Sequence, residues 1–311
     1  MTNLPYCIYL ETSAVNYLAD SFTVEELITI RKLIKKEKNA DFFISSVTIA
    51  EILSTKDELR KEQLIYLMQN ICNDNLLNSP SEFLINYIKA GMPRIEQKYE
   101  FYSNYELSKV WKDLCKNFNK TFIYDSDNLK ERIKFLQKEF SEVVEILFKE
   151  NSYLQNTIEY AMERNNENKT LSNYAKTIIK TSWLLIFIIL CCGVDLLENS
   201  LIEDYWKDLK LETTLDRLIF SVEKLSKLTK LGPIVMMSRM FYCQKEEKIN
   251  RGTIIDMLHS IYLVYCDTFL TNDKHFISFK NSDNHVNFNK IQLVSENIFF
   301  KQLKNIMNQV K

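Results

Sequence analysis

Glycine and proline are scarce in this chain, with only 4 of each among 311 residues. The four glycines stand too far apart to form a GxGxxG or GxxxxGK[ST] phosphate-binding loop: Gly91, Gly193, Gly232 and Gly252. A glycine-rich nucleotide-binding fold is therefore not expected. A turn-dense all-β fold is not expected either, because its many tight turns need these residues. The composition favours a largely helical protein.

Cysteine and histidine also lack the pattern of a metal site or a disulfide framework. The 7 cysteines are an odd number without a CxxC pair, and the 3 histidines cannot complete a usual zinc site. The amino terminus has neither a basic start nor a long apolar run, so it does not resemble a signal peptide. We expect a cytoplasmic protein with reduced thiols.

Neither a dominant charge nor a membrane-length apolar run is present. The 40 basic and 41 acidic residues leave a formal net charge of -1, so any nucleic acid must be bound by a local patch. The most apolar run, Trp183 to Val194, ends at Asp195. It falls short of the roughly 18 residues that a helix needs to span a bilayer. We expect a buried helix there and no membrane segment.

Both ends of the chain alternate short apolar runs with amphipathic helix patterns. The runs predict strands at Cys7–Glu11, Phe42–Ser45, Thr268–Thr271 and Ile291–Val294. Helices are expected between and after them, including amphipathic helices over Val24–Lys38 and Thr253–Cys266. Their caps are expected at Thr12 or Ser13, at Ser46 or Thr48, and at Ser295. Strands separated by helices predict a parallel α/β sheet flanked by helices.

The middle of the chain has the sequence pattern of consecutive helices and lacks the strand-like runs of the two ends. From about residue 56 to 248, helix-period segments follow one another, and this stretch shows no convincing internal repeat. We therefore predict an α/β core in two parts, residues 1–55 and 249–311. A large all-α insertion, residues 56–248, would separate them.

Four acidic residues are expected at the same edge of the predicted sheet. Glu11 ends the first strand, Glu51 lies early in the helix after the second, and Asp273 follows the third. Asp256 opens the helix that runs back toward the third strand, and His259 lies one turn later on the same face. A cluster of carboxylates needs a counter-charge. Mg²⁺ or Mn²⁺ would supply it, which makes these four acids candidate metal ligands and catalytic residues.

Several neighbouring residues have two interpretations each. Asn16 is placed to hold Glu11 or a metal-bound water, or to pack, and Ser13 is a cap or a ligand. Thr271 either orients Asp273 or forms the turn, and His259 either contacts a phosphate or Asp256, or packs on the sheet. Asp267 falls at the start of the third strand, at the opposite edge, where a structural role is favoured.

Three stretches of the sequence resemble the motifs of the PIN domain nucleases. They are Ile8–Leu18, Ile44–Leu53 and Asp256–Phe276, in that order along the chain. Glu51, Asp256 and Asp273 match the family's acids, while Glu11 stands where the family usually has Asp. The resemblance implies a PIN-like fold and a Mg²⁺- or Mn²⁺-dependent endoribonuclease acting on single-stranded or structured RNA, in toxin, host-defence or RNA quality-control roles.

Other functions stay open at this point. The extra methylene of Glu11 displaces its carboxylate, and the helical insertion is absent from compact members of the family. A catalytically weakened PIN-like scaffold, whose insertion binds a protein partner or inhibitor, is the main alternative. A nuclease for single-stranded DNA is another, and the resemblance also allows a homodimer.

Overall fold

The computed structural model of this chain describes residues 6–72, 75–77, 80, 236–237, 239–240, 243–244, 253–264, 266–282 and 289–302. The chain divides into two units. Unit 1 comprises residues 1–78, 99–126 and 262–311, and unit 2 comprises residues 79–98 and 127–261. All strands among the described residues belong to unit 1.

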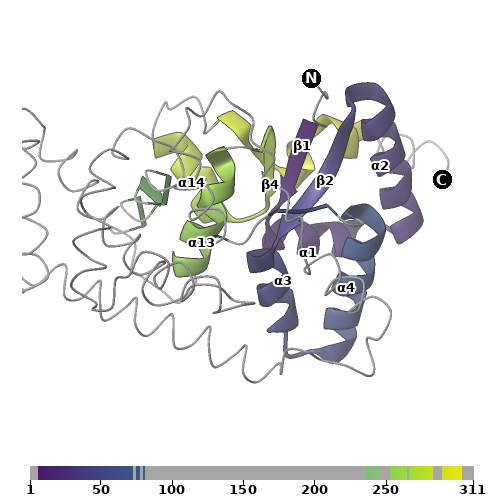
Figure 1. The fold of residues 1–311 in the computed structure, drawn as a ribbon, viewed down its shortest axis with the longest axis horizontal. Helices are drawn as coiled ribbons and strands as arrows, with labels where there is room; N and C mark the ends of the chain where they lie inside the picture. Colours follow the sequence, from purple (N-terminus) through teal and green to yellow (C-terminus); the bar gives the residue numbers. More distant parts are fainter. Residues whose placement is uncertain are drawn as a thin grey trace, which may run out of the picture. The chain divides into compact units, whose positions relative to one another are not determined.

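Unit 1 is built on a five-stranded sheet in the order β3-β2-β1-β4-β5, with every neighbouring pair parallel (Figure 1). The strands are β1 (Tyr6–Leu10), β2 (Ala40–Ser45), β3 (Leu76–Leu77), β4 (Thr268–Thr271) and β5 (Ile291–Leu293). In register, Ile8 of β1 lies opposite Phe42 of β2 and Thr268 of β4. The parallel α/β class expected from the sequence is confirmed.

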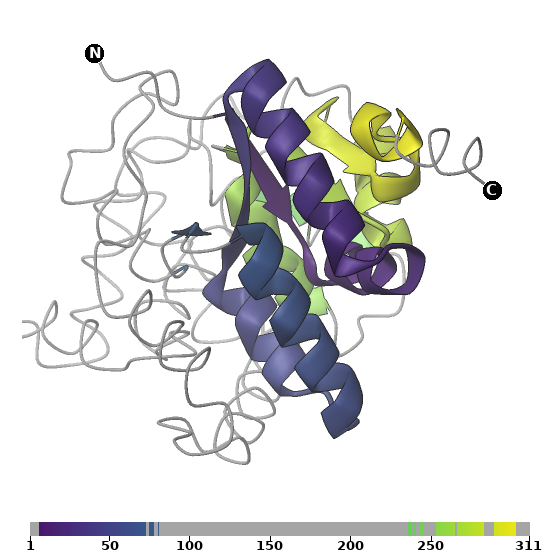
Figure 2. The same ribbon diagram turned by 90° about the vertical axis from the view of Figure 1, so that its right-hand side faces the viewer.

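Helices connect the strands of unit 1 in two opposite directions. Four helices belong to the steps from β1 to β2 to β3: α1 (Thr12–Ser21), α2 (Val24–Lys38), α3 (Ser46–Leu53) and α4 (Glu58–Cys72). The step from β4 to β5 goes the other way through α14 (Lys274–Ser282). Because parallel crossovers are right-handed, α14 covers the face opposite α2 and α4. Figure 2 shows α2 and α4 side by side on one face of the sheet.

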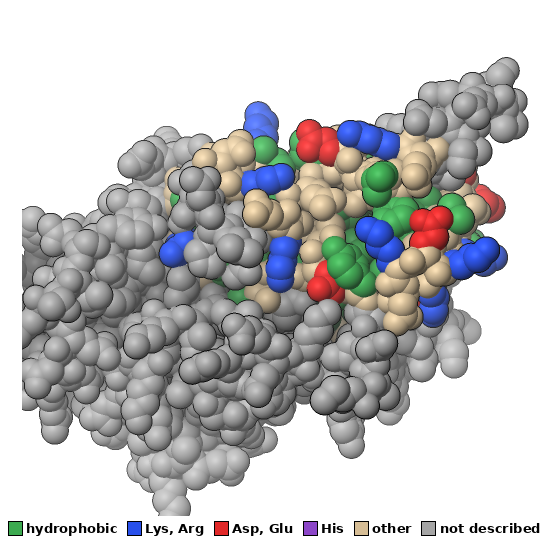
Figure 3. All heavy atoms as spheres, turned by 90° about the horizontal axis from the view of Figure 1, so that it is seen from above, with side chains coloured by type: hydrophobic (Ala, Val, Ile, Leu, Met, Phe, Trp, Pro, Cys, Tyr) green, Lys and Arg blue, Asp and Glu red, His purple; other side chains and the backbone are tan. Residues whose placement is uncertain are grey.

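The core of unit 1 is apolar on both faces of the sheet. All six residues of β2 are buried, as are Tyr9 of β1 and Phe269 of β4. Strands covered by helices on both faces read as continuous apolar runs, which explains why they were recognisable in the sequence. On the face drawn in Figure 3, the described Lys and Arg side chains are interspersed with acidic and apolar ones.

The helix starts differ from the sequence-based expectation at three places. Ser45, not Ser46 or Thr48, is the N-cap of α3, because its side chain accepts the N–H of Thr48. Glu11, not Thr12 or Ser13, is the N-cap of α1, because its own carboxylate accepts the backbone N–H of Ser13. The last helix begins after Asn297, not Ser295, and the Asn297 side chain accepts the N–H of Phe299 at 3.1 Å. In each case a nearby polar side chain with better reach takes the capping position.

Three elements also differ from the expected division of the chain. Helix α13 (Thr253–Ser260) lies within the range assigned to the α/β core, yet it belongs to unit 2. Helix α4 and strand β3 lie within the range assigned to the helical insertion, yet both belong to unit 1. β3 pairs with β2 through Ile44–Leu76 and Ser45–Leu77. A two-residue strand produces no periodic pattern, so it could not be recognised from the sequence.

Unit 2 is described only in part. Its helix α13 (Thr253–Ser260) is followed by the 3-10 turn η2 (Ile261–Val264), where the sequence predicted one helix to residue 266. The other helices expected in the insertion, including the apolar run at 183–194, lie outside the described residues. Within the described ranges, no helix combines the length and apolar character that a membrane crossing requires.

Candidate functional site

The site lies where the direction of the chain through the sheet reverses. β1 and β4 are neighbours, and the helices that follow them lead to opposite sides, so their carboxyl ends form a topological switch point. In open parallel sheets, ligands bind at such a point, in the crevice outside the strand ends. Glu11 follows β1 here, and its backbone N–H bonds the carbonyl of Leu270 at 3.1 Å.

Glu11 is a buried carboxylate, 5% exposed, that is held by three hydrogen-bond donors. The N–H of Ser13 donates to Oε1 at 2.9 Å, and the hydroxyl of Ser13 donates to Oε2. The hydroxyl of Thr271 donates to Oε2 at 2.9 Å. A negative charge is also favourable at the N-terminus of a helix, where Glu11 caps α1. The carboxylate is therefore rigidly oriented at the end of β1.

The loop after β4 is joined to Glu11 through the same two hydroxyl groups. Ser13 Oγ accepts the N–H of Asn272 at 2.8 Å, and Thr271 Oγ1 accepts the N–H of Asp273 at 2.9 Å. The Asp273 carboxylate, one third exposed, accepts the N–H of His275 at 2.6 Å. Ser13 and Thr271 thus connect the acid after β1 with the acid after β4, as hydrogen-bonding residues of the site.

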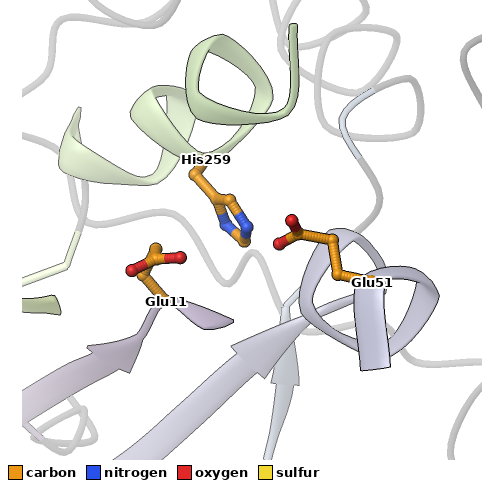
Figure 4. Close-up of side chains that lie close together, drawn as sticks. All are labelled: Glu11, Glu51 and His259. Atoms are coloured by element: carbon orange, nitrogen blue, oxygen red, sulfur yellow. The ribbon is translucent and has the colours of Figure 1, made fainter. Parts of the chain in front are cut away.

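Glu51 brings a second carboxylate to the first. It lies on α3 and is half-buried, and the hydroxyl of Thr12 donates a hydrogen bond to its Oε2. One carboxylate oxygen of Glu51 lies within 4.8 Å of one of Glu11. Figure 4 shows the two carboxyl groups, from the end of β1 and from α3, turned toward each other. His259, drawn in the same figure, lies on α13 of unit 2.

Two other sequence candidates of unit 1 point elsewhere. The Asn16 side-chain amide donates to the backbone carbonyl of Thr12 at 3.1 Å, and its Oδ1 accepts from Arg60 at 3.1 Å. Asn16 therefore braces α1 against α4 rather than contacting a carboxylate in these bonds. Asp267 lies at the start of β4, where its Oδ2 accepts the N–H of Cys7 at 2.8 Å. That position is at the opposite edge of the sheet from Glu11.

The remaining candidates, Asp256 and His259, lie in unit 2. Both are buried on α13, and they stand three residues apart, so they share one face of the helix. Asp256 is 8% exposed, and its Oδ2 accepts a hydrogen bond of 2.8 Å from the side-chain amide of Gln244. Sequence reasoning had not singled out Gln244, because an isolated Gln in a helical stretch carries no motif.

Two further residues of unit 1 were also missed as parts of the site. Thr12 was interpreted only as a cap, although its place beside Glu11 was the available signal. Tyr9 is fully buried, and its hydroxyl lies 2.7 Å from Ser45 Oγ and 3.3 Å from Thr48 Oγ1. Burial raises the pKa of Tyr9 well above its ordinary value, and the nearby Tyr262 and Glu11 add to this effect, so the phenol stays protonated.

The two glutamates have the chemistry of a site for a hard divalent cation. Carboxylate oxygens are the ligands that Mg²⁺ and Mn²⁺ prefer, and two like charges this close are stabilised by a counter-ion. Comparisons of the chain with family models, with curated proteins and with solved structures find no match.

Proposed function

We propose that this chain is a metal-dependent endoribonuclease with a PIN-like core. The observation that carries the proposal is the meeting of Glu11 and Glu51 at the carboxyl ends of β1 and β2, within 4.8 Å of each other. The resemblance of three stretches of the sequence to PIN motifs supplies the reaction and the substrate class. We propose Asp256 and Asp273 as the other two ligands of Mg²⁺ or Mn²⁺.

The residues would divide the work between binding and orientation. A bound divalent cation activates water and stabilises the negative charge of a phosphodiester transition state. Glu11 and Glu51 would hold the cation, while Ser13, Thr271 and Thr12 keep the two carboxylates in place through the hydrogen bonds described above. His259, one turn from Asp256, would orient that acid or contact the scissile phosphate.

The test is a cleavage assay on the full chain with pooled cellular RNA and with single-stranded DNA, in Mn²⁺, Mg²⁺ or EDTA. Glu51→Gln and Asp256→Asn should each lower the cleavage rate at least roughly 100-fold, since removing a group that merely orients a metal ligand already costs up to about that much. Asp267→Asn is the matched control, because it neutralises an acid at the opposite edge of the same sheet. Cleavage that survives EDTA or Glu51→Gln would contradict the proposal, and cutting of DNA alone would change its substrate.

A second candidate function is a scaffold with a weakened site, and one observation favours it. Glu11, which replaces the usual Asp, is already bound by three donors and serves as the cap of α1. A carboxylate used in this way is a poorer ligand for a cation. If the chain is a scaffold, the unmodified protein should cleave no nucleic acid in any of these metals. The Glu11→Asp variant should then either gain cleavage activity or bind Mn²⁺ no more tightly than the unmodified chain. The helical insertion would then bind a protein partner.

A further inference from the structure

A series of three buried, hydrogen-bonded hydroxyl groups lies between the segments that carry the two glutamates. It consists of Tyr9 on β1, Ser45 at the end of β2 and Thr48 on α3, and we refer to these three residues as the hydroxyl clamp. All three are fully buried, with an exposed fraction of 0%. The clamp contains no charged group and contacts neither carboxylate in the bonds described here, so the proposed reaction does not use it directly.

The hydrogen bonds of the clamp run in one direction. Thr48 donates to the backbone carbonyl of Leu10 at 3.2 Å, because a carbonyl can only accept. Its single proton is then used, so in the 3.3 Å contact Tyr9 donates to Thr48. Tyr9 also has one proton, so in the 2.7 Å contact Ser45 donates to Tyr9. The chain Ser45 → Tyr9 → Thr48 → Leu10 therefore ends on the peptide that precedes Glu11.

The clamp joins the two segments that carry the glutamates. Ser45 is the N-cap of α3 and accepts the N–H of Thr48, so both residues belong to the first turn of this helix. Glu51 lies three residues after Thr48 and thus about one turn further along α3. At the other end, Leu10 is bonded covalently to Glu11. The position of α3 against the end of β1 is consequently held by the direct bond of Thr48 to Leu10 and by Tyr9, which bonds both Ser45 and Thr48.

The ring of Tyr9 has little freedom to move. It stacks on Tyr262, with ring centroids 4.8 Å apart and an angle of 24° between the planes, and it packs against Phe269 at 5.2 Å. Because the ring is packed against aromatic rings on two sides, its hydroxyl group has a fixed position. Because the ring of Tyr9 is fixed, its hydroxyl holds the first turn of α3 at a constant distance from β1.

We propose that Tyr9, acting through the hydroxyl clamp, is a positioning residue that sets the separation of Glu11 and Glu51 for binding a divalent cation. This inference rests on the proposed metal site, but it adds a residue that touches neither the cation nor the substrate. Groups that orient metal ligands typically change metal affinity by roughly 10- to 100-fold when they are removed. Because Tyr9 acts at one remove from the ligands, we expect the lower end of this range.

The experiment measures the affinity of the full chain for Mn²⁺ by calorimetric titration, below the temperature of unfolding. Tyr9→Phe keeps the stacked ring and removes the hydroxyl, and it should weaken Mn²⁺ binding about tenfold. Tyr6→Phe is the matched control on the same strand. It also removes a hydroxyl with two contacts, to Asp267 at 3.3 Å and Thr268 at 3.0 Å, but at the opposite end of β1. Its Mn²⁺ affinity should stay within about twofold of that of the unmodified chain.

A second pair of variants distinguishes a loss of Mn²⁺ affinity from a folding defect. Thr48→Val has nearly the same shape but no hydroxyl, and should weaken Mn²⁺ binding as Tyr9→Phe does, whereas Thr48→Ser keeps the hydroxyl and should retain affinity. Equal Mn²⁺ affinity of Tyr9→Phe and the unmodified chain, or equal losses in Tyr9→Phe and Tyr6→Phe, would overturn the inference alone. No Mn²⁺ binding by the unmodified chain would overturn the proposed metal site together with the inference.

Discussion

Asp41, at the start of β2, is a buried carboxylate with a protein partner. The guanidinium of Arg31 binds both of its oxygens, Nε to Oδ1 at 2.8 Å and Nη2 to Oδ2 at 3.0 Å. Burial by itself raises the pKa of Asp41, but the hydrogen bonds and the charge of Arg31 outweigh it, so the pKa lies below its ordinary value. Glu11 and Glu51, at the other end of the sheet, are held by uncharged donors in the bonds described above.

Replacing Asp41 by Asn should lower the free energy of unfolding at pH 7 by about 3 kcal/mol, because Arg31 is left without its buried partner. A lowered pKa means that the stabilisation is fully present above the ordinary value of 3.8 and is lost as the pH falls through the value in the folded chain. The difference between Asp41→Asn and the unmodified chain should therefore shrink below about pH 4. Urea unfolding at several pH values measures it.

The control for this experiment is the exposed pair of Asp20 with Arg60, whose atoms lie 2.7 Å apart. The Asp20 side chain is 65% exposed, so the charge is well solvated whether or not it is paired. Asp20→Asn should change the free energy of unfolding by no more than about 1 kcal/mol. If Asp20→Asn and Asp41→Asn lowered the free energy of unfolding equally, the burial of the Asp41–Arg31 pair would not be the cause of the loss.

Helix α2 shows how fully a local sequence can specify an element. Its bounds, Val24–Lys38, are those that the amphipathic pattern predicted. Thr23 and Glu26 form a reciprocal capping box at its start, and Asn39 ends it in the left-handed conformation with φ of 48°. Asn is one of the few residues other than glycine that adopts this conformation readily. Both end signals are local, so no tertiary contact is needed to place this helix.

The capping box can be tested by substitution at its first residue. Thr23→Ala removes the acceptor for the N–H of Glu26, 3.3 Å away, and should lower the free energy of unfolding by about 1 kcal/mol. Thr23→Ser keeps the acceptor and should be close to neutral, and so should Glu26→Gln, since Gln also completes a capping box. Thermal unfolding followed by circular dichroism measures all three, and a neutral Thr23→Ala would contradict the assigned role of the cap.

The sheet of unit 1 brings together strands from distant parts of the sequence. β1 lies between β2 and β4, although the end of β1 at Leu10 and the start of β4 at Thr268 are separated in the sequence by 257 residues, 11 to 267. This pairing creates the switch point and places Glu11 next to Thr271. A cation bound there would connect elements from distant parts of the chain, so metal binding should be linked to the stability of the fold.

This linkage predicts opposite effects of one substitution with and without metal. Glu51→Gln removes repulsion between two carboxylates less than 5 Å apart, worth about 1 kcal/mol in a water-like medium, so the metal-free variant should unfold less readily than the unmodified chain. Saturating Mn²⁺ should stabilise the unmodified chain by about 2.7 kcal/mol at 100 times the dissociation constant, and the variant hardly at all. Calorimetric melting curves in Mn²⁺ and in EDTA test this, and an equal Mn²⁺ shift in both proteins would refute the site.

Local features of the sequence were sufficient for most strands and for α2 in the described part of unit 1. Buried strands read as short apolar runs, β4 was predicted with its observed bounds, and the amphipathic pattern located α2. The acids Glu11, Glu51 and Asp273 were recognisable because Glu11 and Asp273 follow the ends of predicted strands and Glu51 lies early in the helix after another. These features depend on residues within a few positions of one another, which is the range over which side-chain pattern and backbone conformation are coupled.

The order of the strands, the hydrogen bond from Thr271 to Glu11 and the hydroxyl clamp could not be read from the sequence. Each depends on contacts between distant segments: β1 with β4, Glu11 with Thr271, and Tyr9 with Ser45 and Thr48. Strand pairing and buried hydrogen bonds are settled when the core closes and every buried polar group must find a partner. The sequence therefore supplied the acids and the strands that carry them, while the packing of the sheet determined which acids meet and what holds them.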